Sequence, residues 1–156
     1  MAHNNLGVAL IRSGRLPEAI EQFEQALRLK PDDAEAHSNL GVLFLRTGRL
    51  PEAIKQLEQS LKINSDNHLV HNNLGVALLG SGRLLEAIEQ FEQSLKINSD
   101  DHSVHNNLGV ALMESGRLLE AVEQFEQALR LEPDYAVARE NLHKAQTLLK
   151  LNPAKN

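Results

Sequence analysis

A chain of 156 residues, 42% hydrophobic and 24% charged, has the length and composition of an ordinary soluble protein with a buried core. Its net charge of −5 argues against nucleic acid or an anionic membrane as the main partner. The absence of cysteine excludes disulfides, thiolate nucleophiles and cysteine-ligated metals, and it is compatible with the cytoplasmic location that we expect. No stretch approaches the ~20 apolar residues that span a bilayer.

The sequence repeats with a period of 34 residues. The octapeptide HNNLGVAL begins at His3, His71 and His105, and its near-copy HSNLGVLF begins at His37. A fixed period of this length indicates stacked helical or strand units rather than a closed globule. Three columns of small residues keep the same spacing: Gly7, Gly41, Gly75 and Gly109; Gly14, Gly48, Gly82 and Gly116; Ala19, Ala53, Ala87 and Ala121.

Each unit is predicted to contain two helices. The segment VHNNLGVALLGS places Leu74, Ala77 and Leu78 on one helical face. Gly82 follows, where a residue that can adopt a left-handed conformation suits the position just past a helix end. The second helix begins at LPEA or LLEA, and Pro17 fits its first turn. Links such as KPDD and NSDN supply a capping Asp or Asn for the next helix, and no period-two alternation predicts a strand.

The chain is predicted to form one array over residues 1–150. A lone helix over about 136–150 is expected to cap the array, as open arrays require, and 151–156 is expected to be a flexible tail. No matching cover precedes the first unit, so the N-terminal edge is expected to be a truncation or a self-association surface. The predicted units cover about 1–33, 34–67, 68–101 and 102–135.

The motif order within each unit resembles the tetratricopeptide repeat (TPR). The motifs are N-L-G-x-x-[LF], then G-R-L-x-E-A-[IV], then F-E-Q-[AS]-L, and the resemblance runs from about Met1 to Tyr135. Histidine replaces the family's aromatic residue near the start of the first helix, Leu57 replaces Phe, and Ser65 and Ser99 replace a linking Pro. The resemblance implies an all-α TPR solenoid, a right-handed superhelix of four antiparallel helix pairs plus the capping helix, with the first helices lining a concave groove.

Small residues are expected to bring the two helices of a pair close together. Gly75 and Ala87 would allow this approach, while Leu74, Leu78 and Phe91 fill the space around them. A larger side chain at Gly75 is expected to overpack the pair at a cost of about 1–3 kcal/mol.

The histidine column is interpreted as half-buried packing between helices. A shared metal would require several imidazoles near ~2.1 Å of one ion, whereas successive helix pairs lie ~10 Å apart. His68 with His71, and His102 with His105, are i,i+3 pairs that would together hold at most an adventitious divalent ion. No carboxylate pattern accompanies them, so we predict neither a functional metal site nor a cofactor.

An unbroken asparagine column is the main candidate for binding. Asparagine inside a helix lowers helix stability by several tenths of a kcal/mol relative to alanine, so its recurrence at one position needs an explanation. An amide carries a donor and an acceptor and can pair with a peptide group, and a rung every ~10 Å matches about three extended residues. The column resembles the asparagine ladder of the TPR domain of O-linked N-acetylglucosamine transferase, which grips extended polypeptide. The alternative is a local amide network between neighbouring helices, and the two roles can coexist. The column comprises Asn5, Asn39, Asn73, Asn107 and Asn141.

Other residues on the first helices are expected to complete the binding surface. A valine column falls on the same side as the asparagines and is expected to form pockets for small or aliphatic side chains. Asn72 and Asn106 add polar contacts. The candidate pocket residues are Val42, Val76 and Val110, preceded by Val8 in the first unit.

Two functional classes are not expected. The carboxylate clamp by which some TPR proteins hold chaperone tails needs Lys and Arg on the groove helices, where this chain has Asn4, Ser38, Leu69 and Asn72. The carboxylates and histidines recur in register, whereas a catalytic pair is normally unique to one pocket, so no active site is predicted. The glutamates of the second helices, such as Glu18, are expected to form a solvated surface.

The predicted function is therefore a non-catalytic module that binds a protein or an extended peptide, with no nucleic acid and no membrane as partner. One alternative is the substrate-recruiting part of a larger enzyme such as a glycosyltransferase. The other is a structural unit that self-assembles through its N-terminal edge, or a consensus-like or engineered array without an evolved ligand.

Overall fold

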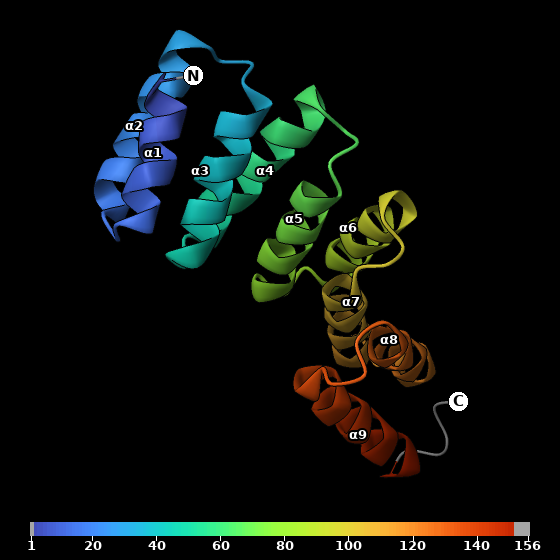
Figure 1. Cartoon of the computed structure of the whole chain (residues 1–156). Coiled ribbons are helices and arrows are strands. Elements are labelled where there is room, and N and C mark those ends of the chain that lie inside the picture. Colours follow the sequence, from blue (N-terminus) through green and yellow to red (C-terminus); the bar gives the residue numbers. More distant parts are fainter. Residues whose placement is uncertain (1, 152–156) are drawn as a thin grey trace. The chain divides into compact units, whose positions relative to one another are not determined.

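The computed structural model describes residues 2–151, which form nine α-helices without any strand (Figure 1). This confirms the all-α fold of four helix pairs and a C-terminal helix. Leu151 ends the last helix, and the rest of the predicted tail lies outside the described residues. The helices are α1 (Ala2–Arg12), α2 (Leu16–Leu29), α3 (Ala34–Arg46), α4 (Leu50–Ile63), α5 (His68–Gly80), α6 (Leu84–Ile97), α7 (His102–Glu114), α8 (Leu118–Leu131) and α9 (Ala136–Leu151).

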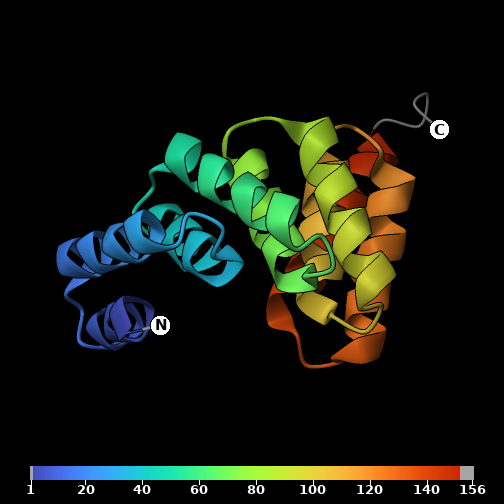
Figure 2. The ribbon, with the colours of Figure 1, turned by 90° about the horizontal axis from the view of Figure 1, so that it is seen from above.

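The chain divides into two compact units, Met1–Ala77 and Leu78–Asn156, and the division falls inside α5. In the first unit α1 packs on α2, α2 on α3, and α3 on α4. In the second unit α6 packs on α7, α7 on α8, and α9 on both α7 and α8. Short loops join the helices of each unit (Figure 2). The single array over 1–150 stays a prediction.

The first helix of each pair ends as the sequence predicts. Gly82 has φ +74° and Gly116 has φ +83°, a left-handed conformation that costs other residues about 1–2 kcal/mol. This turn lets the N–H of Arg117 donate to the carbonyl of Leu112 at 2.9 Å, which satisfies an orphan carbonyl of α7.

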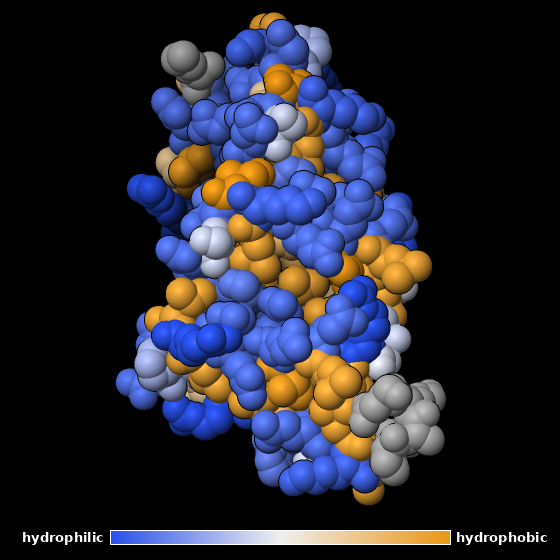
Figure 3. All heavy atoms as spheres, turned by 90° about the vertical axis from the view of Figure 1, so that its right-hand side faces the viewer, coloured by the Kyte–Doolittle hydropathy of each residue, from blue (hydrophilic) through white to orange (hydrophobic). Residues whose placement is uncertain are grey.

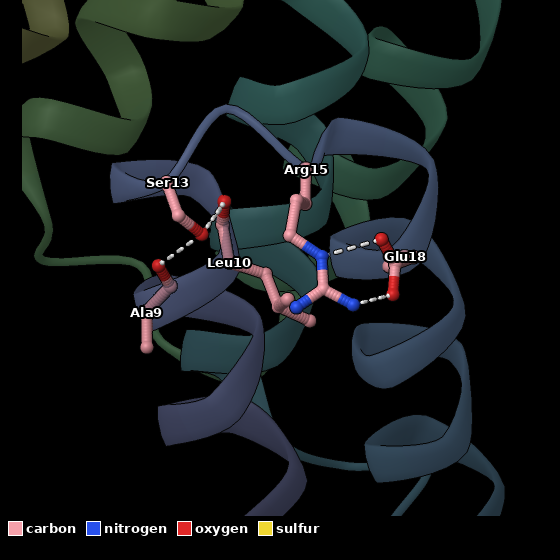
Figure 4. A network of polar contacts seen from close by, with 5 residues as sticks. All are labelled: Ala9, Leu10, Ser13, Arg15 and Glu18. Atoms are coloured by element: carbon pink, nitrogen blue, oxygen red, sulfur yellow. Dashed lines mark hydrogen bonds and ion pairs between the residues drawn. The ribbon is translucent and has the colours of Figure 1, made fainter.

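The turn into the second helix carries a repeated ion pair, seen for the first repeat in Figure 4. The Nε of Arg15 donates to Oε1 of Glu18 at 2.6 Å, while the Ser13 hydroxyl donates to the carbonyls of Ala9 and Leu10. The hydrogen bond from Arg15 holds the pKa of Glu18 below its usual value, so the pair stabilises the fold only until the pH falls through that lowered pKa. Exposed pairs of this kind contribute little. The equivalent pairs are Arg49–Glu52, Arg83–Glu86 and Arg117–Glu120.

Aspartates cap first helices, as predicted. Oδ1 of Asp33 accepts a hydrogen bond from the N–H of Ala36 at 3.1 Å. Oδ1 of Asp101 accepts from the N–H groups of Ser103 and Val104 at 3.0 and 3.3 Å. Burial raises the pKa of Asp101, but the hydrogen bonds from Ser103 and Val104 outweigh it and hold that pKa below its usual value.

The second helices present their glutamates to solvent, as expected. Figure 3 shows one face of the molecule, on which hydrophilic side chains predominate and apolar atoms emerge between them. Scattered apolar exposure such as that of Leu85 is normal for a folded protein. The exposed glutamates include Glu18, Glu21, Glu24, Glu86, Glu89 and Glu92.

The two helices of a pair approach closely at glycine. A Cβ added to Gly109 would lie 2.6 Å from the ring of Phe125, and one added to Gly7 would lie 2.7 Å from the ring of Phe23. Both rings are fully buried. The glycine column therefore has the packing role that the sequence predicts.

The second repeat exchanges an aromatic and an aliphatic core residue. Leu57 occupies the position of Phe23, and its Cγ lies 2.7 Å from where a Cβ of Gly41 would be. Phe44 stands instead on the first helix, 4% exposed, with the guanidinium of Arg49 4.2 Å from its ring centroid. The aromatic ring has moved from the second helix to the first, which conserves the volume of the core.

We expect the two exchanged residues to be energetically coupled. Leu57→Phe alone should overpack the pair by about 1–3 kcal/mol, and Phe44→Leu alone should leave a cavity and lose about 0.5–1 kcal/mol of cation–π attraction. The double variant restores the pattern of the other repeats and should cost less than the sum of the two. Urea unfolding of the three variants measures this, and strictly additive costs contradict it.

Candidate functional site

The histidine column is half-buried, as expected, and it is also hydrogen-bonded. In the second repeat, Nδ1 of His37 lies 2.7 Å from Oε1 of Gln56 on the second helix, and Nε2 lies 3.0 Å from the carbonyl of Pro31. The ring thus joins the two helices of its repeat and holds the preceding loop. The same contacts recur for His105 with Gln124 and Ser99, at 2.8 and 3.0 Å.

Metal and membrane features are absent from residues 2–151. No group of three or more His, Asp or Glu side chains in this range is placed to hold a metal ion. No helix in the same range is long and apolar enough to cross a membrane.

The asparagine column forms hydrogen bonds between successive repeats. Nδ2 of Asn39 donates to Oδ1 of Asn4 at 3.1 Å in the first unit. Nδ2 of Asn141 donates to Oδ1 of Asn106 at 3.0 Å in the second unit. The two acceptors are buried, with 4% and 5% exposure. A local amide network therefore exists, and each ladder amide in it keeps its carbonyl oxygen and one N–H for another partner.

The predicted binding residues differ in exposure. Asn5 is exposed, and Asn106 is buried beneath Asn141. The remainder are half-buried: Asn39, Asn73, Asn107, Asn141, Asn72, Val42, Val76 and Val110.

A hollow of about 470 Å³ brings several of these residues together in the first unit. Its walls are the start of α3, the end of α4, and the first turns of α5. It contains Asn39, Asn73 and Val42, so two ladder amides and one predicted pocket residue share one concavity. We call it the α3–α5 hollow, and its lining comprises Ala34, Glu35, Ser38, Asn39, Val42, Ser60, Asn64, Asn67, Leu69, Val70 and Asn73.

Hydrogen bonds hold the walls of the α3–α5 hollow in place. Oδ1 of Asn67 accepts from the N–H groups of Leu69 and Val70 at 3.1 and 3.3 Å and so caps α5. The buried Ser60 donates through Oγ to the carbonyl of Ala34 at 2.8 Å, which ties the end of α4 to the start of α3. The hollow is thus formed before any ligand arrives, which lowers the entropic cost of binding.

The lining combines apolar side chains with polar groups and carries a single charge. Glu35 is the one ionisable side chain among the described residues of the hollow, and the other polar groups are amides and hydroxyls. The sequence prediction missed Glu35 and the capping residues Asn64 and Asn67. Asn64 and Asn67 lie between α4 and α5, and Glu35 lies in the first turn of α3. The sequence pattern predicts capping residues at such positions, but it does not show that they border a cavity.

Two further hollows contain none of the predicted binding residues. One, of about 620 Å³, lies between α2, α3 and α4 and includes His37, Arg49 and Lys55. The other, of about 430 Å³, lies between α7 and α9 and includes Met113 and Leu148. The first also includes the amides of Gln56 and Gln59, but neither hollow contains a ladder asparagine.

The family assignment rests on the sequence and agrees with this fold. The family model of the tetratricopeptide repeat matches residues 4–68 and 72–136, most of the chain. The chain belongs to the tetratricopeptide repeat family. No curated protein sequence matches this TPR chain significantly.

Solved structures of other proteins share this architecture. A crystal structure of MamA matches with a TM-score of 0.89 at 19% identity, covering 96% of this chain and 87% of MamA. Another MamA structure matches at 26% identity and a TM-score of 0.83, covering 95% and 85%. YrrB, described as a TPR protein with an unusual peptide-binding site, matches at 24% identity and a TM-score of 0.86, covering 98% and 78%. Because the first MamA structure and YrrB are only 19% and 24% identical to this chain, their similarity shows the fold alone.

Proposed function

We propose that this TPR chain is a non-catalytic interaction module that binds an extended peptide, with the α3–α5 hollow as a principal contact. The observation that carries the proposal is the presence of Asn39 and Asn73 in one preformed hollow. Each amide offers a donor and an acceptor, which is what a peptide group needs in order to pair along its backbone. The description of YrrB as a peptide-binding TPR protein agrees with this function.

The other ladder residues are proposed as further peptide contacts, each within its own unit. Asn5 in the first unit, with Asn107 and Asn141 in the second, offers further amides at the same repeat position. Val76 and Val110 are proposed to form side-chain pockets, as Val42 does in the hollow. Asn72 and Asn106 complete the proposed set, with Asn106 acting through its hydrogen bond to Asn141.

The lining of the hollow supports one class of peptide. Ala34, Val42, Leu69 and Val70 suit a small or aliphatic side chain, while Glu35 attracts a cation and repels a carboxylate. The peptide is therefore extended, carries short aliphatic residues, and is basic rather than acidic.

Binding of a labelled peptide tests this function. The probe is a fluorescein-labelled peptide of three Ala-Val-Lys units, about 30 Å long when extended, and its counterpart carries Glu in place of Lys. Fluorescence anisotropy should show saturable binding of the Lys peptide, about tenfold tighter than that of the Glu peptide at low salt.

Matched charge variants identify the source of the preference. Glu35→Gln should reduce the difference between the two peptides, whereas Asp32→Asn, an exposed position outside the hollow, should leave it unchanged. Failure of both peptides to saturate below ~1 mM contradicts the proposed function. A preference that survives Glu35→Gln assigns the charge selectivity to another residue.

A further inference from the structure

We infer that Asn73 is the ladder amide that pairs with the peptide backbone in the α3–α5 hollow, and that Ser38 keeps it available. This inference rests on the proposed function and divides the ladder into structural and binding members. Its starting point is an irregularity in the column that precedes the ladder. That column reads Asn4, Ser38, Asn72 and Asn106, so serine interrupts it in the second repeat.

The ladder bonds follow a fixed offset. Asn39 donates to Asn4 and Asn141 donates to Asn106, each time across 35 residues. The residue 35 positions before Asn73 is Ser38, whose side chain is shorter than that of asparagine and has no amide carbonyl. Among the described residues, nothing is hydrogen-bonded to the side chain of Asn73.

The unpaired amide lies where a ligand would need it. Asn73, Ser38 and Asn39 all line the same hollow, and the Asn73 side chain is half-buried. Its carbonyl and both N–H hydrogens are available, so it can accept from a peptide N–H and donate to a peptide C=O together. Asn39 has one N–H committed to a buried acceptor, so its amide cannot turn toward a peptide group without leaving Asn4 unsatisfied, whereas the Asn73 amide can turn. Asn39 therefore positions a wall of the hollow, and Asn73 binds.

Substitution of Asn73 is the direct test. With the Ala-Val-Lys probe, Asn73→Ala should weaken binding about tenfold or more, because a desolvated peptide group loses both partners. Its far-UV circular dichroism and urea midpoint should stay those of the wild type. Asn39→Ala should show the opposite pattern, with a lowered urea midpoint and a smaller effect on binding.

Substitution of Ser38 tests whether this residue keeps the Asn73 amide available, which we call its gating role. The test adds an amide group rather than removing one. Ser38→Asn restores the amide acceptor present in the other repeats, and the Asn73 amide should then donate to it as Asn39 does to Asn4. Binding of the probe should weaken about tenfold, and the urea midpoint should not fall. Ser38→Ala adds no acceptor and should weaken binding of the probe far less than Ser38→Asn, while Asp32→Asn, an exposed position outside the hollow, should bind like the wild type. In the Ser38→Asn background, Asn73→Ala should have little further effect.

Side-chain amide NMR signals give a readout that does not depend on variants. Addition of the probe to the unmodified chain should shift the Nδ2H2 resonances of Asn73 more than those of Asn39.

The outcomes separate the inference from the proposed function. If Asn73→Ala binds the probe as tightly as the wild type, the inference is overturned while the proposed function stands. If Ser38→Ala and Ser38→Asn lose the same amount of affinity for the probe, the gating role is overturned, because the serine side chain then contacts the peptide itself. Absence of wild-type binding overturns the proposed function, and the inference with it.

Discussion

Gly109→Ala is expected to lower the free energy of unfolding by about 1–2 kcal/mol, although alanine is the better helix former. The added Cβ would lie 2.6 Å from the ring of Phe125, which is fully buried on the facing helix. A separation below 3 Å forces the ring or the helix to move, and a close-packed core resists both. The overpacking cost of about 1–3 kcal/mol therefore exceeds the gain of about 1 kcal/mol from helix propensity.

Urea unfolding followed by circular dichroism measures this effect. Glu114→Ala is the matched control, because Glu114 is exposed on the same helix and its replacement should change stability by less than about 0.5 kcal/mol. A Gly109→Ala chain at least as stable as the wild type would show that Phe125 moves without cost, and it would remove close approach as the reason for the glycine column.

Asn141→Ala is expected to destabilise the chain by about 1–3 kcal/mol, an unusual cost for a half-buried polar residue near the end of the fold. The substitution removes the donor to Oδ1 of Asn106, a buried residue with 5% exposure. An orphaned buried acceptor carries its full desolvation cost. The better helix propensity of alanine returns only several tenths of a kcal/mol.

A double-mutant cycle separates this effect from helix propensity. Asn106→Ala should cost less than Asn141→Ala, because it leaves unpaired an amide that solvent can reach. The double variant should be more stable than Asn141→Ala alone, because no buried polar group is then left unpaired. Urea midpoints of the four proteins give the coupling, and equal or additive costs contradict the inter-repeat bond as a stabilising contact.

Local features of the fold follow from the sequence because they depend on neighbouring residues. Gly82 ends a first helix with φ +74°, as a position just past a helix end favours. Asp33 and Asp101 cap the helices that follow them. The 34-residue period was sufficient to predict helix pairs and the family, because every repeat must bury the same face against its neighbours.

The sequence also indicated which column to examine, but not what each of its members does. Asn39 and Asn73 occupy equivalent positions in an identical pattern, and their repeat position alone does not distinguish them. The difference arises at Ser38, one residue before Asn39, which lines the same hollow as Asn73 only once the chain has folded. The exchange of Phe44 and Leu57 is similar, since the coupling that we expect between them arises only where α3 and α4 pack together.

The sequence by itself therefore determined the helices, their ends, their pairing and the family. Those depend on propensity, capping and hydrophobic period, which act over a few residues or repeat at a fixed interval. The tertiary structure alone decided which amides are paired, which hollow they line, and that Glu35 is its one charge. The hydrogen bonds between repeats and the shape of the hollow depend on side chains that lie about 35 residues apart in the chain, and no local pattern encodes their contact.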